Sequence, residues 1–352
     1  MEANRVTATP ITAIKTSRQE FLDADKYVPL GTATIFSGRG GVGKTTFALD
    51  YAAKVSSGRL AGKFEGKPRN VLIVSHEDDP GKQLKPRLQA SGMDERFIHL
   101  VAKGSYDPNQ PPPSMPKLNR PHDMEQIRQL VEIHRPALLI IDPLTSGMDG
   151  DLHKVQDVRQ SLDPLTALAR EFNMAIIALT HTNKGGGAAS DRMSGSHAFR
   201  DAARSVLLFA LDEDNGVTIV TLNKSNYAKH TNSSFKYRLV SVEVPTDDGQ
   251  TTEVAKIELL GASEISVDEL WHREQNGRGD YTETQAWLRD YLIEIGGSAA
   301  SSTIRKASER DGYKWRTIQA AGKKLCEIKR AGYQGQTIWT LSEFNADDQV
   351  LE

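Results

Sequence analysis

The run Gly38–Thr45 (GRGGVGKT) has the spacing G-x-x-x-x-G-K-[ST] of a phosphate-binding loop. Its glycines permit backbone conformations that point successive amide N–H groups at phosphate oxygens. Lys44 would neutralise the β- and γ-phosphates, and Thr45 would place a hydroxyl on Mg²⁺. The motif therefore predicts a site for ATP with Mg²⁺. The residues expected to bind the nucleotide are Gly38, Gly40, Gly41, Val42, Gly43, Lys44, Thr45 and Thr46.

Two carboxylates elsewhere in the chain could complete this chemistry. Asp142 closes the apolar run Ala137–Ile141 (ALLII), and a carboxylate at the end of a buried strand can hold Mg²⁺ through water. The alternative is an aspartate that only caps the strand end. Glu77 follows the run Asn70–Ser75 (NVLIVS), where it could orient and deprotonate the attacking water. We therefore expect Thr45 and Asp142 to hold the metal ion and Glu77 to be the general base.

The choice of Glu77 follows from the residue that stands after Asp142. Many P-loop ATPases have their catalytic glutamate directly after this aspartate, whereas here Pro143 takes that position. The base must then come from another strand end, and Glu77 is the candidate. The alternative is that Asp78 or Asp79 caps the following helix while Glu77 is simply solvated.

These side chains need a scaffold that brings strand ends together. Short apolar runs alternate with amphipathic stretches, and this alternation predicts an α/β fold with a mainly parallel sheet covered on both faces. The expected strands are 32–37, 70–75, 137–141, 174–180, 205–210 and 217–223, with a hairpin of 235–242 and 254–259. The expected helices are 44–56, 80–90, 122–134 and 155–172, and a short helix could cover 17–24.

Length and composition narrow the class of protein. The 352 residues suffice for one large and one small domain. With 38% hydrophobic and 26% charged residues there is no apolar run of membrane-spanning length and no signal-peptide core, so we expect a cytoplasmic protein without a membrane partner. A single cysteine, Cys326, excludes an internal disulfide framework and a multi-cysteine zinc site. The net charge of −2 gives no global sign of nucleic-acid binding.

Together and in this order, these elements resemble the RecA-like ATPases, and most closely the RepA-type hexameric replicative helicases. The resemblance covers roughly residues 25–260. Its further signs are the acidic cluster Glu77–Pro80, the segment His181–Gly185, the pair Gly195–Ser196 and the segment Lys224–Tyr227 (KSNY). It implies a RecA-like fold, hydrolysis of ATP with Mg²⁺, DNA as partner and a homo-oligomer, most typically a hexameric ring.

The resemblance also implies roles for two residues beyond the phosphate loop. His181, which closes the run Met174–Thr180, would face the γ-phosphate and report its state; the alternative is a purely structural histidine. Lys224 would reach the γ-phosphate of the adjacent subunit in the ring. No arginine stands immediately before or within the KSNY segment, so an arginine finger is not assigned, and Lys224 could instead be a solvated strand-end lysine.

The glycine-rich loop 183–194 is where single-stranded DNA would bind. In RecA-like rings the loop after this strand faces the central channel, so Lys184 and Arg192 could contact phosphates without reading bases. The alternative is a surface loop that has no partner.

The C-terminal part of the chain offers separate evidence for DNA. Helices are expected over 284–295, 302–309 and 314–327, followed by a hairpin over 332–341, and this order resembles a winged helix. The segment 304–330 holds nine basic and three acidic residues. Lys314, Arg316 and Lys323 are therefore candidates for contacts with duplex DNA; docking of a protein partner is the alternative.

The expected organisation is a lead-in (1–30), a RecA-like ATPase domain (31–262), a linker (263–280), a winged-helix-like domain (281–342) and a tail (343–352). The function expected from this organisation is an ATP-hydrolysing DNA motor, specifically a ring-forming replicative helicase. Two alternatives remain: a RecA-like filament or recombination ATPase, and a DNA-binding regulator switched by ATP.

Overall fold

The structure is a computed structural model of the chain and describes residues 7–106, 113–148, 154–181, 197–227, 233–277, 283–330 and 337–342. The chain divides into two compact units, Met1–Leu270 and Trp271–Glu352. Among the described residues, no helix combines the length and the apolar character that crossing a membrane requires.

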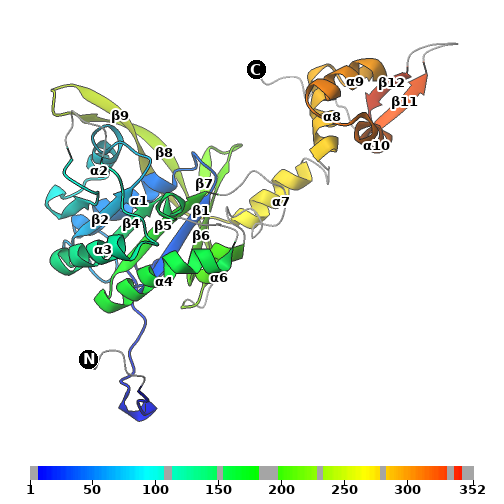
Figure 1. Ribbon diagram of the computed structural model, residues 1–352. Helices are drawn as coiled ribbons and strands as arrows, with labels where there is room; N and C mark the ends of the chain where they lie inside the picture. The colour runs from blue at the N-terminus through cyan, green and yellow to red at the C-terminus, as the bar shows by residue number, and fades with distance from the viewer. Residues whose placement is uncertain are drawn as a thin grey trace. The chain divides into compact units, whose positions relative to one another are not determined.

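The first unit is built on one large sheet with helices on its faces (Figure 1). Its strands are β1 (Thr32–Gly38), β2 (Val71–Ser75), β3 (Ile98–Leu100), β4 (Leu138–Asp142), β5 (Ala175–His181), β6 (Ser205–Asp212), β7 (Val217–Ser225), β8 (Ser234–Pro245) and β9 (Thr251–Ala262). Its helices are η1 (Ile11–Ala13), α1 (Lys44–Ser56), η2 (Pro80–Leu84), α2 (Lys85–Ala90), η3 (Glu95–Phe97), α3 (Pro121–His134), η4 (Leu144–Gly147), α4 (Val155–Phe172) and α6 (His197–Ala202). Helix α7 (Val267–Gly277) spans the boundary between the two units.

The strand order in this sheet is β3-β2-β4-β5-β1-β6-β7-β8-β9. The strands from β3 to β6 pair in parallel, and β7, β8 and β9 extend the sheet as antiparallel strands. A parallel sheet has all its carboxyl ends at one edge, where ligands of α/β proteins bind. This arrangement confirms the predicted α/β fold and is consistent with a RecA-like P-loop fold.

The core lies between this sheet and α1. Successive side chains of a strand point to opposite faces, so Ile73, Ile140 and Ile177 meet Phe47 and its neighbours on α1 in one buried cluster. Helix α4 packs on β1 and β5. Strands covered on both faces read as continuous apolar runs, which is why these strands were recognisable from the sequence.

The second unit has a small core of its own. Helices α8 (Glu283–Glu294), α9 (Ser301–Arg310) and α10 (Trp315–Leu325) accompany an antiparallel sheet in the order β10-β12-β11. Its strands are β10 (Ser298–Ala300), β11 (Cys326–Arg330) and β12 (Thr337–Leu341). Trp339 on β12 stacks on Trp315 with ring centroids 5.5 Å apart. Gly322 of α10 makes room for this ring, because a Cβ there would lie 2.1 Å from Cζ3 of Trp339.

Some elements differ from the sequence-based expectation. Residues 17–24 form no helix, and Leu22, Val28 and Leu30 of the expected lead-in are part of the core. Helix α7 occupies most of the expected linker, because Leu270 and Trp271 are buried. Helix α10 ends at Leu325 rather than at residue 327, since the following residues pair with β12 as a strand.

Candidate functional site

The phosphate-binding loop joins the end of β1 to the start of α1. Gly43 caps α1 with φ 88° and Gly41 has φ 81°, conformations that favour glycine. Gly38 is required for a different reason, because a Cβ there would lie 2.4 Å from the carbonyl oxygen of Phe209 on β6. The N-terminal end of α1 adds its partial positive charge to the loop. The strand, glycine turn and helix expected from the sequence are thus all present.

Lys44 is folded back over this loop. Its side chain is buried, and Nζ donates hydrogen bonds to the carbonyl oxygens of Gly38 at 2.8 Å and Arg39 at 2.7 Å. The same ammonium lies 3.5 Å from Nδ1 of His181. The lysine is therefore positioned by the loop that it serves and lies next to the end of β5.

Asp142 meets the loop from β4. Oγ1 of Thr45 donates a 2.7 Å hydrogen bond to Oδ2 of Asp142, although the two residues are 97 positions apart in the chain. The backbone amide of His76 donates to the carbonyl of Asp142 over 2.8 Å, which ties the ends of β2 and β4. The structure thus brings together the two residues that the sequence predicted as metal ligands.

Glu77 and His181 face each other at the ends of β2 and β5. Oε2 of Glu77 lies 3.7 Å from Nε2 of His181, and both side chains remain accessible. The acidic neighbours of Glu77 are engaged elsewhere. Asp79 accepts from the amides of Gly81 and Lys82 as the N-cap of η2, and Asp78 pairs with Arg87. Glu77 thus remains accessible beside His181, and Asp79 caps the following helix as the alternative proposed.

Burial shapes the electrostatics of the site. It lowers the pKa of Lys44 to about 8, against the opposing attraction of Asp142 and Glu77. It raises the pKa of Asp142 to about 6, and the hydrogen bond from Thr45 opposes this rise. Burial and the nearby Lys44 lower the pKa of His181, which favours a neutral ring between an ammonium and a carboxylate. A bound ligand of opposite charge would therefore stabilise the ionised forms of Lys44 and Asp142, which burial disfavours.

The donor set fits Mg²⁺. Thr45 and Asp142 offer hard oxygen ligands within one hydrogen-bond length of each other. Ser75, which pairs with Asp142 in register, has a buried hydroxyl with no hydrogen-bond partner among the described residues. No cluster of three or more His, Cys, Asp or Glu side chains suited to a metal occurs in the described part of the chain. This suits an ion that is held by few protein ligands and completes its shell with water and phosphate.

Lys224 lies away from this cluster. It pairs with Val206 near the start of β6, whereas the phosphate loop pairs with Phe209 further along the same strand. Nζ of Lys224 donates to the carbonyl of Arg200 over 2.6 Å, and burial lowers its pKa. The structure therefore does not bring Lys224 to the phosphate loop of its own chain.

The candidate nucleic-acid residues fall into two groups. Lys184 and Arg192 lie outside the described residues. Lys314, Arg316 and Lys323 are exposed on α10 or directly before it, while Ile318 and Leu325 of this helix are buried in the core. The basic side chains of this helix thus face solvent, as a contact with DNA phosphates requires.

Two residues of the loop's surroundings escaped sequence reasoning. Thr218 on β7 and Tyr237 on β8 both donate hydrogen bonds to the carbonyl oxygen of Val42. Neither belongs to a local motif, because they stand 176 and 195 positions from Val42. The sequence offered little signal for them, because both strands also carry other polar side chains.

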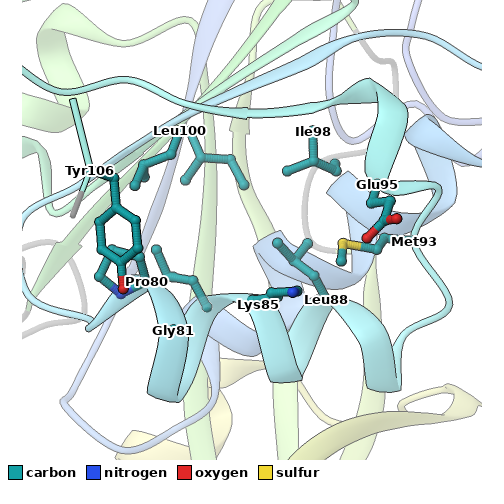
Figure 2. Close-up of a pocket in the computed structure, with 11 residues that line it drawn as sticks. Pro80, Gly81, Lys85, Leu88, Met93, Glu95, Ile98, Leu100 and Tyr106 are labelled. Carbon is teal, nitrogen blue, oxygen red and sulfur yellow. The ribbon is translucent and has the colours of Figure 1, made fainter. Parts of the chain in front are cut away.

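A separate apolar cavity of about 300 Å³ lies between β2, β3 and the helices η2 and α2. Figure 2 shows Ile98 and Leu100 lining it opposite the helix that carries Lys85 and Leu88, with Met93 beside Leu88 at one end. Lys85 pairs with Asp247 at its rim. The cavity is distinct from the phosphate loop and holds none of the residues predicted to act on ATP.

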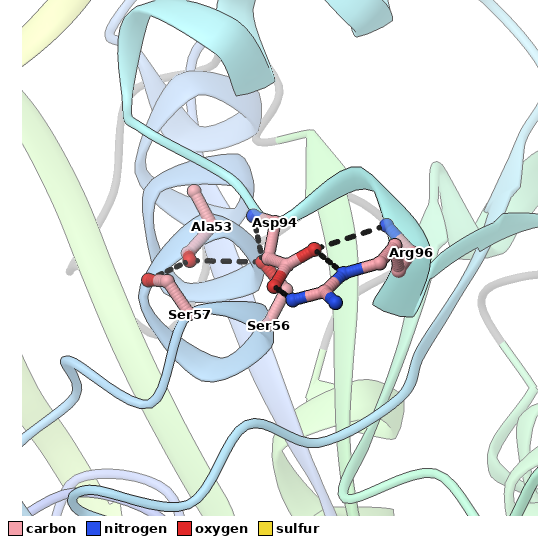
Figure 3. Close-up of polar contacts among 5 residues, drawn as sticks. All are labelled: Ala53, Ser56, Ser57, Asp94 and Arg96. Atoms are coloured by element: carbon pink, nitrogen blue, oxygen red, sulfur yellow. Dashed lines mark hydrogen bonds and ion pairs between the residues drawn. The ribbon is translucent and has the colours of Figure 1, made fainter.

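The segment beside this cavity is fixed to the far end of α1 (Figure 3). The amide of Asp94 donates to Oγ of Ser56 over 3.0 Å, and Ser56 in turn donates to the carbonyl of Ala53 over 2.9 Å. Arg96 donates to both carboxylate oxygens of Asp94. Helix α1 is thus anchored at its C-terminal end as well as at the phosphate loop.

Comparison with known proteins identifies an AAA domain and relatives that are named as DNA repair proteins. A protein-family model described as an AAA domain matches residues 4–187. DNA repair protein RadA of Mycobacterium tuberculosis is 29% identical over 168 residues, which cover 46% of this chain and 29% of that protein. DNA repair protein RadA of Streptococcus pneumoniae is 27% identical over 199 residues, which cover 55% of this chain and 40% of that protein. The chain therefore matches less than half the length of either relative.

Proposed function

Because the chain belongs to the AAA domain family and has a RecA-like P-loop fold, we propose that it is an ATP-hydrolysing DNA motor. In the finer form of this proposal it assembles into a ring, most simply a hexamer, and unwinds DNA as a replicative helicase of the RepA type does. The names of the relatives, DNA repair proteins, support DNA as the partner more strongly than they support any one reaction on DNA.

One observation carries the ATPase part of the proposal. Four neighbouring strands, β2, β4, β5 and β1, end side by side and deliver Glu77, Asp142, His181 and the phosphate loop to one edge of the sheet. The hydrogen bond between Thr45 and Asp142 and the close approaches of His181 to Lys44 and Glu77 join them into one cluster. This set would supply an anion cradle, a pair of metal ligands and a carboxylate to activate water.

The residues would divide the work as follows. The triphosphate would replace the carbonyls of Gly38 and Arg39 as the partner of Lys44, and anionic oxygens would favour the ammonium that burial disfavours. Mg²⁺ held at Thr45 and Asp142 would neutralise charge on the β- and γ-phosphates. Glu77 would orient water and accept its proton.

His181 would link the chemistry to DNA. Its ring stands between Lys44 and Glu77, so it borders the place that a γ-phosphate would occupy. The loop with Lys184 and Arg192 follows directly in the chain. A change at His181 on hydrolysis would then be passed to a loop that contacts single-stranded DNA in the channel.

Contact between subunits would involve Lys224. Its distance from its own phosphate loop agrees with a role at the neighbouring subunit's nucleotide, as the family arrangement implies. Proposed contact with duplex DNA rests on the second unit. The helix–strand–helix–helix–strand–strand order there and the exposed Lys314, Arg316 and Lys323 support a winged helix that binds DNA.

The test is ATPase activity with and without single-stranded DNA, for the wild type, Lys44→Ala and Glu77→Gln, combined with sizing in ATP. We expect stimulation by DNA in the wild type and loss of hydrolysis in both variants. Glu77→Gln should still bind ATP, because its amide removes the base but not the cradle. Lys54→Ala is the control, since this lysine lies on the last turn of α1 and pairs with Asp50.

The outcomes separate the candidate functions. Ring-sized particles and strand separation support the helicase. Open filaments on DNA without strand separation would point to a recombination-type ATPase instead. Specific footprints with weak stimulation of the ATPase would point to a regulator. No stimulation by any nucleic acid would contradict the motor, and normal hydrolysis by Glu77→Gln would contradict this choice of base.

A further inference from the structure

The carbonyl oxygen of Val42, inside the phosphate loop, is held by two hydroxyl groups from the antiparallel part of the sheet. Oγ1 of Thr218 on β7 donates to it over 3.0 Å, and the hydroxyl of Tyr237 on β8 donates over 2.8 Å. A carbonyl oxygen has two lone pairs, so these two donors occupy both of its acceptor positions. The orientation of the Val42–Gly43 peptide is thereby fixed from outside the loop.

This orientation decides where the next amide points. The peptide group is planar and trans, so the N–H of Gly43 points away from the carbonyl of Val42. With the carbonyl directed at β7 and β8, the N–H is directed to the opposite side of the loop. In a G-x-x-x-x-G-K-[ST] loop that side is the cradle for the α- and β-phosphates.

Both donors are themselves held rigidly. Tyr237 is fully buried, and its ring stacks on Phe47 of α1 with centroids 5.4 Å apart and planes 13° from parallel. Thr218 is 2% exposed. The tyrosine oxygen also lies over the loop itself, because a Cβ on Gly43 would come within 3.0 Å of it. The loop therefore rests on a fixed surface that β7 and β8 provide.

We propose that Thr218 and Tyr237 are positioning residues of the nucleotide site, which hold the Gly43 amide toward the phosphates. This inference rests on the proposed binding of ATP. The amide that they orient contacts phosphates present in ATP and ADP alike. Their contribution is therefore to nucleotide affinity and not to the hydrolytic step.

The experiment compares Thr218→Val and Tyr237→Phe with matched controls in the full chain. Thr221→Val is the first control, because Thr221 is equally buried on β7 but its hydroxyl contacts Ser234 and the amide of Val267. Tyr51→Phe is the second, because Tyr51 packs on the same Phe47 ring, with centroids 5.2 Å apart. Dissociation constants for ATP and ADP, kcat at saturating ATP and urea unfolding are measured for each chain.

Each test variant should raise the dissociation constants of ATP and ADP by the same factor, about 3- to 10-fold, which is the effect of losing one hydrogen bond. The value of kcat at saturating ATP should stay near that of the wild type, since the loss is equal in the ground and transition states. The controls should bind both nucleotides as the wild type does, even where their unfolding shifts.

Three results would overturn the inference. The first is wild-type affinity in both test variants. The second is a loss of affinity that the controls share. The third is a lowered kcat with unchanged affinity, because that pattern signals a smaller fraction of folded protein. If the wild-type chain bound ATP no better than Lys44→Ala does, the proposed function and this inference would both be overturned.

Discussion

Replacing Asp142 by asparagine should stabilise the chain when nucleotide and Mg²⁺ are absent. Asp142 is 7% exposed, and burial, with smaller effects of Asp78 and Glu77, raises its pKa from 3.8 to about 6. The ionised form of Asp142 is therefore energetically unfavourable in the protein without ligands. Asparagine has nearly the same shape and keeps an oxygen that can accept the hydrogen bond from Thr45.

The size of the effect follows from this pKa. A rise from 3.8 to about 6 corresponds to about 3 kcal/mol at most, because each pKa unit is worth 1.36 kcal/mol. The folded chain binds this proton more tightly than the unfolded chain. The contribution of Asp142 to stability is therefore present below pH 3.8 and is lost as the pH rises through about 6. Asp142→Asn should match the wild type near pH 4 and exceed it near pH 8.

The assay is urea unfolding in EDTA near pH 4 and near pH 8, followed by hydrogen exchange in peptides from β1, β4 and β5. Asp23→Asn is the control. Asp23 is also buried and has a pKa raised by burial to about 6, but its two carboxylate oxygens accept from the amides of Tyr27 and Val28. An asparagine there presents an N–H group to one of these amides, so relative to the wild type this variant should be less stable near pH 8 than Asp142→Asn.

A specific outcome would refute the reasoning about Asp142. If Asp142→Asn were no more stable near pH 8 than the wild type and Asp23→Asn, Asp142 would be a structural hydrogen-bond acceptor and not a carboxylate whose ionised form is unfavourable until a ligand binds. The ranking should reverse when Mg²⁺ and ATP are added. The wild type gains the free energy of ligand binding, whereas the variant has lost a metal ligand.

Three further predictions concern other parts of the chain. Glu77→Gln should lower kcat by at least about 100-fold with little change in ATP affinity, measured by steady-state hydrolysis and equilibrium binding; equal losses in both would contradict the role of base. Gly322→Ala should destabilise the second unit by about 1–3 kcal/mol in urea unfolding, because the new methyl group would overlap the Trp339 ring; unchanged stability would show that the ring can move aside. Replacing Arg316 and Lys323 by alanine should weaken binding to duplex DNA and flatten its dependence on the logarithm of salt concentration by about 2, if each contacts one phosphate; an unchanged slope would favour protein docking.

Much of the candidate site could be predicted from the sequence because its residues sit at recognisable positions. The phosphate loop is a contiguous motif, and Asp142 and His181 each close an apolar run that reads as a buried strand. Glu77 required one more step: Pro143 stands directly after Asp142, where many P-loop ATPases have their catalytic glutamate, so the base had to be sought at another strand end. The parallel sheet then brings such strand ends together without further information.

Other features depended on tertiary contacts that no local pattern encodes. The hydrogen bonds from Thr218 and Tyr237 to Val42 join residues on strands that the order β1-β6-β7-β8 brings under the loop. The residues after Leu325 could continue a helix by local preference, but pairing of Cys326–Arg330 with β12 prevails. Helix α7 was not predicted, because its apolar face is short and Gly277 and Gly279 stand at its C-terminal end, as in a linker.

The division into two units gives the protein a built-in optical reporter. All four tryptophans, Trp271, Trp287, Trp315 and Trp339, belong to the second unit. Trp287, Trp315 and Trp339 pack in the core of that unit, so their indole emission reports on it, while ATP is expected to bind in the other unit. A change in this emission on adding ATP would be a direct, label-free sign that the second unit responds to nucleotide bound in the first.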